Sequence, residues 1–402
     1  MKSSGLMPLQ QAVDIILADA ESRRGVERVN LARADGRVLA EDVCAPMDVP
    51  PWDNSAMDGY AVQAEEALEG AILDVSQRIP AGTEPEALQP ATAARIFTGA
   101  PVPAGANAVI MQENCELLPD GRVRILATVK PGANIRRRGD DIAEGALLVS
   151  AGQRLTPLDL GLLAATGVSQ LLTGKPPVVA ILSTGDELVE PGEALRPGQI
   201  YSSNAIVIQA LLRRMGLQVI NCGTVADRPD ATANALAEAA RQADCIITTG
   251  GVSAGEEDHV RAAVQEQGRL DIWKLALKPG KPFAYGRVNE ALFFGLPGNP
   301  VSAVVSFLLL VRPALLCCMG VSQSGLPWRL READFATTAS EREEYLRVRL
   351  VSGDDQKIVP FRNQSSGVSS SLSFADGLAV IPPHTAIRRG DMLRFVAFDD
   401  IF

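Results

Sequence analysis

Histidine is almost absent from this chain, which has two in 402 residues, and aromatic residues make up only 4%. His259 and His384 are too few for a histidine-based metal site, and neither stands in a Ser or Cys motif of the kind a catalytic triad needs. The six cysteines show no Cys-x-x-Cys spacing and two are adjacent, which argues against a zinc or disulfide framework and favours buried reduced thiols. The chemistry that remains is that of carboxylates, lysines and Mg²⁺.

An excess of positive charge is also missing. The chain has 38 Lys and Arg against 48 Asp and Glu, a net charge of −10, which is the wrong sign for nonspecific binding to nucleic acid or to an anionic membrane. Its first residues lack the pattern of a secretory signal, and its longest apolar stretch, 301–319, contains Arg312 and Pro313 and predicts a buried helix rather than a membrane span. We therefore expect a cytoplasmic protein that binds neither nucleic acid nor membrane, and any anionic ligand must be held by local positive charge.

What the chain does contain, between residues 177 and 301, is one pattern repeated four times: an apolar run that ends in a glycine-rich loop with Asp, Glu, Lys or Ser. The runs have the length and β-branched content of strands buried on both faces, so the loops should lie at strand carboxyl ends, where open α/β sheets bind ligands. Glycine lets the backbone approach a phosphate, carboxylates suit Mg²⁺ and lysines suit oxyanions. The four loops are 183–187, 248–258, 278–281 and 295–302.

These loops also have structural interpretations. Asp258 could simply cap the helix that follows it, and Asn299-Pro300 is a common helix start, although a helix N-terminus at this edge also suits an anion. Lys274, Lys278 and Lys281 could form a solvated surface cluster. Each is flanked by apolar or rigid residues, which favours their use as oxyanion ligands.

The alternation of predicted elements indicates an α/β domain that takes in residues 6–25 and 174–325. A mostly parallel sheet covered on both faces is expected there. The elements on which this rests are a helix over 6–23, strands at 178–182, 217–221, 244–249 and 271–275, and helices at 203–215, 230–242, 258–267 and 300–317.

The rest of the chain predicts three further domains. Residues 45–144 have the short apolar pairs between Pro, Gly and Asp of a small β-rich domain, and 326–402 return to short strands and predict a β-barrel. Residues 26–44, with a helical piece around 31–40, and 145–173, with a helix capped by Thr156, flank the β-rich block. We expect these flanks to pair as a stalk that carries the block as an insertion.

The inserted block contains two dense polar motifs, 50–60 and 136–141. The first packs two prolines, a tryptophan, an asparagine and two aspartates before Tyr60, which is unusual for a simple hairpin. The second places three arginines before Asp140 and Asp141. A solvated charge run is the ordinary explanation of the arginines, and an oxyanion clamp beside a metal ligand is the sharper alternative.

Motifs in order along nearly the whole chain, at 53–62, 98–103, 134–141, 183–188, 250–253, 278–282 and 295–300, resemble the MoeA family of bacterial molybdopterin molybdenumtransferases, which is related to the gephyrin E domain. The resemblance implies a multidomain α/β plus β fold with a MogA-like central domain, a stalk, an inserted β-rich domain and a C-terminal β-barrel. It implies an enzyme that inserts molybdate into adenylylated molybdopterin with Mg²⁺, releasing AMP and forming the molybdenum cofactor. It further implies a homodimer whose active site is shared between subunits, with the molybdopterin adenylyltransferase and molybdoenzyme chaperones as candidate partners.

The resemblance also implies a set of site residues. The catalytic residues would be Asp58, Asp141, Asp227, Lys274, Lys278 and Lys281, and the metal ligands Glu187, Asp227 and Asp258. Substrate would be bound by Thr98, Arg136, Arg137, Ser183, Thr184, Gly185, Gly250, Gly251, Ser253, Pro297, Gly298, Asn299 and Pro300. Relatives often have Glu where this chain has Asp140, so the role of that residue is left open, and the loosely similar stretch 363–367 is expected to make at most a supporting contact.

Two rival functions remain. A scaffold protein, which the gephyrin relationship suggests, would need a partner-binding region, and the chain shows no long linker that would lead to one. An adenylyltransferase acting one step earlier would use a similar α/β domain. It would not need the inserted block or the C-terminal barrel.

Overall fold

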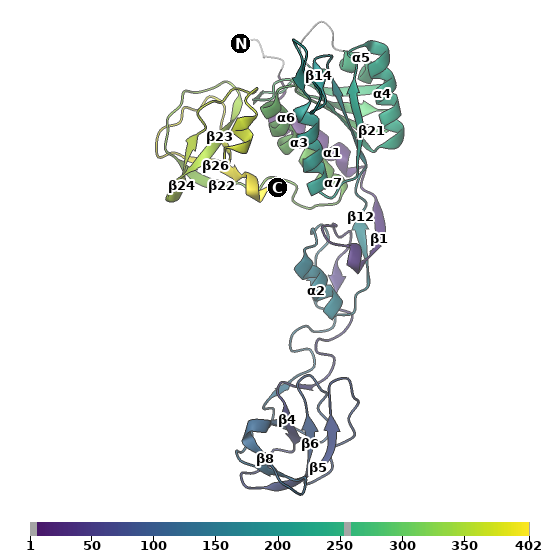
Figure 1. Ribbon diagram of the computed structural model, residues 1–402, viewed down its shortest axis with the longest axis vertical. Helices are drawn as coiled ribbons and strands as arrows, with labels where there is room; N and C mark the ends of the chain where they lie inside the picture. The colour runs from purple at the N-terminus through teal and green to yellow at the C-terminus, as the bar shows by residue number, and fades with distance from the viewer. Residues whose placement is uncertain (1–5, 253–258, 402) are drawn as a thin grey trace.

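The computed structural model describes residues 6–252 and 259–401 and shows an elongated molecule (Figure 1). The α/β domain and the C-terminal domain lie together at one end, and a narrow stalk leads from the α/β domain to the inserted domain at the other end. The predicted multidomain α/β plus β architecture is confirmed.

A six-stranded sheet with the order β16-β13-β17-β21-β20-β18 forms the centre of the α/β domain. Its strands are β13 (Val179–Thr184), β16 (Val219–Val225), β17 (Cys245–Thr249), β18 (Gly268–Trp273), β20 (Ala284–Val288) and β21 (Ala291–Leu296). The first three and β21 run parallel, as predicted. β20 and β18 add an antiparallel edge, because only two residues, Asn289 and Glu290, join β20 to β21, and so short a link permits only a hairpin.

Side chains alternate between the two faces of this sheet, and helices cover both. Val179 and Ile181 face α1 (Leu9–Glu21), α3 (Ser203–Arg214) and the helix that begins at Pro300, whereas Ala180 and Leu182 face α4 (Pro229–Gln242) and α5 (His259–Gln267). This period of two is the one expected for a buried strand. The core of the domain therefore lies on both sides of β13 and β17.

The long apolar stretch forms one continuous helical segment made of α6 (Pro300–Ser306), a π-helical turn (Phe307–Val311) and α7 (Arg312–Cys318). Because Pro313 has no N–H to donate, a locally altered hydrogen-bond pattern just before it is expected. Among the described residues this is the one helix long and apolar enough to cross a membrane, but 94% of its most apolar window is buried inside the protein. It is a core helix, as predicted.

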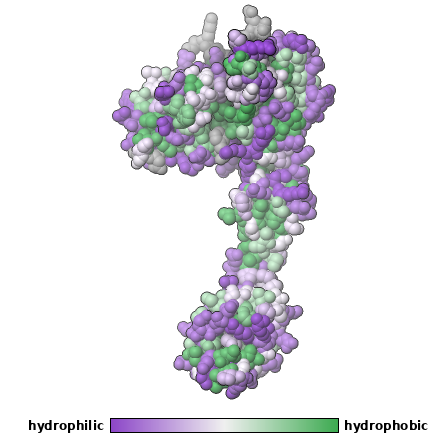
Figure 2. All heavy atoms as spheres, viewed as in Figure 1, coloured by the Kyte–Doolittle hydropathy of each residue, from purple (hydrophilic) through white to green (hydrophobic). Residues whose placement is uncertain are grey.

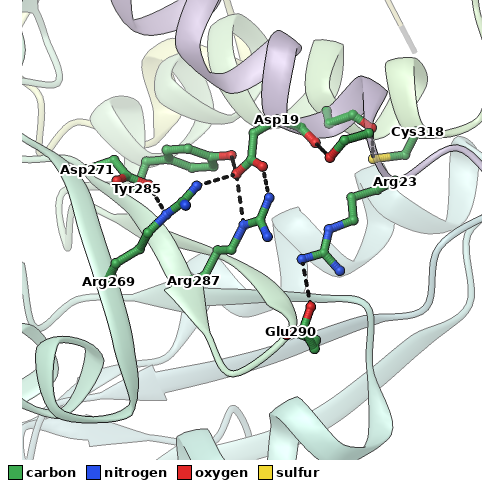
Figure 3. A network of polar contacts seen from close by, with 10 residues as sticks. Asp19, Arg23, Arg269, Asp271, Tyr285, Arg287, Glu290 and Cys318 are labelled. Atoms are coloured by element: carbon green, nitrogen blue, oxygen red, sulfur yellow. Dashed lines mark hydrogen bonds and ion pairs between the residues drawn. The ribbon is translucent and has the colours of Figure 1, made fainter.

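A polar network attaches α1 to the antiparallel edge of the sheet (Figure 3). The Asp19 carboxylate accepts hydrogen bonds from the Tyr285 hydroxyl (2.7 Å) and from Arg287 Nε (3.1 Å), and Arg269 Nη2 lies 3.4 Å away. The Asp19 side chain is only 10% exposed, so these donors replace most of the water that the carboxylate would otherwise bind. α1 ends at Glu21, earlier than predicted.

The stalk is built from two chain segments that pair with each other. β1 (Val26–Asn30) pairs antiparallel with β12 (Gln170–Gly174), and β2 (Val43–Cys44) pairs with β11 (Leu147–Val149). Helix α2 (Pro157–Ala165) begins at the predicted Thr156, whose side chain forms a capping box with Asp159.

The helix expected around 31–40 is wrong. Only a 3₁₀ turn, Leu31–Arg33, forms there. The backbone N–H groups of Gly36, Leu39 and Ala40 donate across the stalk to carbonyls of the second segment, each at 3.0 Å, so pairing between the two segments replaces a local helix.

The inserted domain contains a six-stranded sheet with the order β7-β4-β6-β5-β9-β8. Its strands are β4 (Gly59–Val62), β5 (Ile72–Ile79), β6 (Thr92–Ile96), β7 (Ala108–Met111), β8 (Cys115–Leu117) and β9 (Val123–Ile125). β3 (Asn54–Ser55) and β10 (Ile135–Arg136) pair separately and bring the two polar motifs of the insertion side by side.

The C-terminal domain is a closed barrel of five strands in the order β23-β24-β22-β26-β25, with β25 returning to β23. The strands are β22 (Arg329–Ala333), β23 (Glu343–Val351), β24 (Asp354–Pro360), β25 (Gly377–Ile381) and β26 (Met392–Ala397), and a short helix, α8 (Ser370–Ser373), lies between β24 and β25. A two-residue strand of the α/β domain, β19 (Leu277–Lys278), pairs with β23 and joins the two domains.

All six cysteines are free, as predicted, but only three of them are buried. Cys245, Cys317 and Cys318 lie in the core of the α/β domain, and burial raises the pKa of Cys318 to about 12. Cys44 and Cys222 are exposed, so the expectation that the thiols are buried holds for half of the set.

Candidate functional site

A cleft of about 630 Å³ opens at the carboxyl ends of the parallel strands. The loops after β13, β16, β17 and β21 meet there, where the sequence predicted a ligand site. The predicted site residues that line the cleft are Thr184, Gly185, Glu187, Asp227, Gly250, Gly251, Pro297, Gly298, Asn299 and Pro300.

Gly250 and Gly251 let the loop after β17 press against the end of β13. Both have positive φ, +95° and +68°. A Cβ on Gly250 would lie 2.7 Å from the Thr184 carbonyl oxygen, and one on Gly251 would lie 2.5 Å from Thr184 Oγ1. No residue with a side chain fits either position without a shift, so the backbone of this loop is the surface that a ligand meets.

Hydroxyl groups line the floor beneath these glycines. Ser183 Oγ lies 2.9 Å from Thr249 Oγ1 and 3.4 Å from Ser202 Oγ, so Ser183 is buried against its neighbours and supports the floor. Thr184 Oγ1 is buried and has no partner among the described residues. A buried hydroxyl without a partner costs free energy, and a polar ligand in the cleft would satisfy it.

Among the described residues, two carboxylates line the cleft, those of Glu187 and Asp227. The Glu187 carboxylate folds over Gly185, within 2.4 Å of where a Cβ of that glycine would stand, and the Asp227 N–H donates to Asp186 Oδ1 at 3.1 Å. No Lys or Arg lines the cleft in the parts of the chain that the structure describes. The cleft is therefore acidic, which an anionic ligand tolerates only with a cation beside it.

None of the three predicted lysines lines the cleft, although Pro282, next to Lys281, does. They belong to the connection from β18 to β20, which starts at the same sheet edge. Lys278 Nζ forms an ion pair with Glu344 Oε1 of the barrel (2.9 Å). The Glu344 side chain is 13% exposed. Lys281 is exposed, and Lys274 is partly buried with φ +80°.

The C-terminal domain contributes one wall of the cleft. Gly367 lines it, and the Ser366 carbonyl accepts a hydrogen bond from the Val301 N–H (3.1 Å) at the start of α6. The stretch 363–367 thus makes a direct contribution, more than the supporting contact expected from sequence. It also occupies an N–H that the predicted anion site at this helix start would otherwise offer.

A buried guanidinium fixes this wall. Arg347 is 1% exposed and donates from Nε to Ser371 Oγ (3.1 Å) and from Nη2 to the Ser365 carbonyl (3.1 Å). Gln364 donates to the Arg347 carbonyl at 2.7 Å in return. Burial lowers the pKa of Arg347 to about 10.

The other predicted residues lie in the inserted domain. Asp58 Oδ1 accepts hydrogen bonds from the Thr98 N–H (2.8 Å) and from the Thr98 hydroxyl (2.7 Å). The N–H bond, followed by the hydroxyl bond, lowers the pKa of the Asp58 carboxyl. Asp58 is therefore held as an anion with one oxygen committed to the loop around Thr98.

The arginine run is largely paired within its own domain. Arg137 Nη1 lies 2.6 Å from Asp53 Oδ2, and Arg138 Nε lies 2.5 Å from Asp48 Oδ2. The Asp140 carboxylate accepts the Arg137 N–H (2.6 Å), which gives this residue a structural role. Arg136, exposed, makes no such pair in the described structure, so an oxyanion clamp of all three arginines is not preformed.

Asp141, which is also exposed, follows this run at the stalk end of the inserted domain. The cleft belongs to the α/β domain, and within one chain this domain and the inserted domain lie at opposite ends of the molecule (Figure 1). The predicted site residues thus form two separate groups, one in each domain. Ser253 and Asp258 lie outside the described residues.

Three residues that line the cleft, Tyr201, Ser202 and Asn204, lie outside every predicted loop. Three others, Thr249, Ser302 and Gly367, lie in the predicted stretches 248–258, 295–302 and 363–367 but were not predicted individually. Asn204 Nδ2 donates to the Gly298 carbonyl (2.7 Å) and so ties α3 to the loop after β21. The Ser202-Ser203-Asn204 sequence at the start of α3 was a signal for a polar helix start. For Gly367 the one signal was the loose family resemblance of 363–367.

Comparison with known proteins covers most of the chain. Three family models match: the MoeA N-terminal region (domain I and II) over residues 7–167, a probable molybdopterin binding domain over 180–316, and the MoeA C-terminal region (domain IV) over 329–398. A molybdopterin molybdenumtransferase of Haemophilus influenzae is 42% identical over 319 residues, 79% of each chain. A second one, from Mycobacterium tuberculosis, is 39% identical over 366 residues, 88% of this chain and 90% of that one.

Solved structures agree over the full length. Two structures of MoeA proteins from Pyrococcus horikoshii match with TM-scores of 0.84 and 0.79, at 32% and 29% identity. Each match covers 98% of this chain, and 99% and 100% of those chains.

Proposed function

The chain belongs to the MoeA family of molybdopterin molybdenumtransferases, and from this premise we propose that it inserts molybdenum from molybdate into adenylylated molybdopterin and releases AMP. The observation that carries this proposal is the cleft at the strand ends. It combines backbone made accessible by Gly250 and Gly251, the unpartnered Thr184 hydroxyl and the carboxylates of Glu187 and Asp227. Backbone N–H groups suit the phosphates of such a substrate, and the carboxylates suit a divalent cation.

The donor set fits Mg²⁺. This ion prefers oxygen ligands and is commonly held by one or two carboxylates, with substrate phosphates and water completing its octahedron. Glu187 and Asp227 would hold it, and Thr184 Oγ1 lies in the same cleft. Bound there, Mg²⁺ would supply neutralisation of charge on the pyrophosphate that links the pterin to AMP.

The chain's own residues have separable roles in this proposal. The loop of Gly250 and Gly251 orients the phosphates, and Asp227 and Glu187 would hold the cation that an anhydride in this acidic cleft needs beside it. Lys274 and Lys281 attract molybdate. Lys278 is already paired with Glu344, so it helps to hold the barrel wall against the α/β domain as well.

We further propose that the working enzyme is a cytoplasmic homodimer in which Asp58, Thr98 and Arg136 of one subunit approach the cleft of the other. The distance between the two groups of residues within one chain supports this arrangement (Figure 1). Apolar surface on the stalk supports it too. Figure 2 shows hydrophobic residues on the visible face of the stalk, and the stalk residues Leu158 and Leu147 are 85% and 56% exposed. Exposed apolar patches of this kind commonly mark interfaces.

A direct test is AMP release from adenylylated molybdopterin in the presence of Mg²⁺, with and without molybdate, combined with transfer of the product to an apo-molybdoenzyme. Asp227→Asn should lower both the rate of AMP release and the amount of active product. The control is Asp120→Asn, which makes the same change in an exposed ion pair with Arg122 in the inserted domain and should leave both unchanged. Wild-type rates in Asp227→Asn would refute the assignment. Formation of adenylylated pterin from ATP and unmodified molybdopterin would favour the rival adenylyltransferase.

A further inference from the structure

Two arginines of the inserted domain stand opposite each other on neighbouring strands. Arg78 of β5 and Arg95 of β6 are register partners in a parallel pair, and Tyr60 of β4 is the partner of Arg95 on its other side. Like charges placed opposite each other in a sheet are destabilising. The position therefore calls for a compensating contact.

The contact that the structure provides is aromatic. The Cζ atoms of Arg78 and Arg95 lie 4.5 Å and 4.8 Å from the centre of the Phe97 ring, and Arg95 Cζ also lies 5.2 Å from the centre of the Tyr60 ring. Attraction between a guanidinium and an aromatic ring is worth about 0.5–1 kcal/mol at an exposed site. It does not neutralise the charge.

No carboxylate within ion-pair distance compensates either arginine in the described structure. Arg95 donates to two neutral acceptors, the Gly59 carbonyl (3.1 Å) and Gln112 Oε1 (2.7 Å). Arg78 is exposed and lies over the Phe97 ring. The carboxylate of Asp58 next to Gly59 already accepts two bonds from Thr98. The Thr98 bonds lower the pKa of Asp58 most, and the charge of Arg95 lowers it further, so Asp58 offsets part of the Arg95 charge without an ion-pair contact. Two guanidiniums side by side, neither in an ion pair among the described residues, still form a local anion site.

We propose that Arg78, Arg95 and Phe97 bind the adenylyl group of the substrate, with the guanidiniums on its phosphate and its planar base stacked against this aromatic and guanidinium surface. Guanidinium groups both bind phosphate through paired N–H donors and stack on flat rings, so one surface serves both parts of a nucleotide. This inference rests on the proposed function and adds to it the part of the site that recognises AMP. It also places that part beside Asp58 and Thr98.

Photolabelling of the full-length protein locates the site. Irradiation with 8-azidoadenosine 5′-monophosphate, followed by peptide mapping, should label peptides that contain Tyr60 or residues 78–97, and excess AMP should prevent the label. Adenosine, which lacks the phosphate, should compete poorly. Label confined to the α/β domain, or equal competition by adenosine and AMP, would overturn the proposal.

Substitution gives the second measurement. Arg78→Gln should weaken AMP binding roughly tenfold, and Phe97→Leu should weaken it by a similar factor. The control Arg122→Gln removes one positive charge from an exposed hairpin of the same domain and should bind AMP as wild type does. Unchanged AMP affinity in both Arg78→Gln and Phe97→Leu would contradict the proposal. If inorganic phosphate bound as tightly as AMP, the site would be one for oxyanions alone, which would also contradict it.

The two proposals fail in different ways. If wild-type protein neither releases AMP from adenylylated molybdopterin nor forms cofactor, the proposed function is wrong, whatever the binding data show. If it does both and Arg78→Gln changes neither AMP affinity nor the KM for the adenylylated substrate, the cofactor chemistry stands and this nucleotide site is wrong. A rise in KM with kcat unchanged is the result expected of a residue that binds substrate without taking part in the chemistry.

Discussion

Mixed dimers give the sharpest test of a site shared between subunits. Asp58 and Asp227 lie in domains at opposite ends of one chain (Figure 1), so a site that needs both must draw them from two chains. Asp58→Asn keeps an oxygen to accept from Thr98, and Asp227→Asn keeps the size of the side chain, so neither change should disturb the fold. Each homodimeric variant should fall to about a hundredth of wild-type activity or less, the usual loss when a charged group at a reaction centre is removed.

The symmetry of a twofold dimer fixes the activity of each combination. In a dimer of one Asp58→Asn chain and one Asp227→Asn chain, one site has both aspartates and the other has neither, so the dimer should show about half the activity of wild type. In a dimer of one wild-type chain and one chain carrying both changes, each site lacks one aspartate, so activity should be near zero.

Coexpression with two affinity tags and tandem purification isolates each mixed dimer, and AMP release is the assay. A site contained within one chain predicts the reverse: no activity for the first combination and about half for the second. That outcome would refute the shared site. Because the two dimers contain the same four aspartate positions and the same number of changes, a general loss of stability cannot imitate the predicted difference.

Three further predictions concern single features. Gly251→Ala should destabilise the protein by about 2–4 kcal/mol in chemical denaturation and weaken substrate binding, because its φ is positive and its Cβ would meet Thr184 Oγ1; stability equal to wild type would show that the loop can move aside. Asp19→Ala should lower the free energy of unfolding by about 3 kcal/mol, because it leaves Tyr285, Arg287 and Arg269 without their shared carboxylate (Figure 3). A change in Tm of less than a degree would contradict this. The hydrogen bond from the Arg138 N–H is the main cause that lowers the pKa of Asp53. The ionised carboxylate therefore stabilises the inserted domain above its unfolded pKa of about 4, and this stabilisation is lost as the pH falls through the lower folded pKa. Amide hydrogen exchange in this domain should accelerate over that pH range, and the acceleration should be smaller in Asp53→Asn.

Local sequence patterns were sufficient for the elements that local physics decides. The apolar run before Ser183 predicted a buried strand, and Thr156-Pro157 predicted the start of a helix; both are observed because neighbouring residues along the chain fix them. The position of the cleft followed as well, since parallel strands bring their carboxyl ends to one edge.

Contacts between distant segments were not predictable in this way. The ion pair of Lys278 with Glu344 joins two domains, and the hydrogen bond from Val301 to Ser366 does the same. Neither partner carries a local signal of the other. The failed helix around 31–40 has a similar cause, because the backbone groups of that segment pair with the second stalk segment, more than a hundred residues away.

The distribution of charge bears on why the proposed site would need residues from both domains. The described cleft presents Glu187 and Asp227 and no basic side chain, yet the proposed substrate is a pyrophosphate and the metal arrives as an oxyanion. In the inserted domain, Arg78, Arg95 and Arg136 form no ion pair with a carboxylate among the described residues, whereas Arg137 and Arg138 do. At an effective dielectric constant of about 20, two unit charges 4 Å apart interact by about 4 kcal/mol, so an anion placed between the two halves gains from both a bound divalent cation and the guanidiniums. The acidic cleft and these three arginines are therefore complementary in charge, and an anionic substrate between them would favour the approach that we propose.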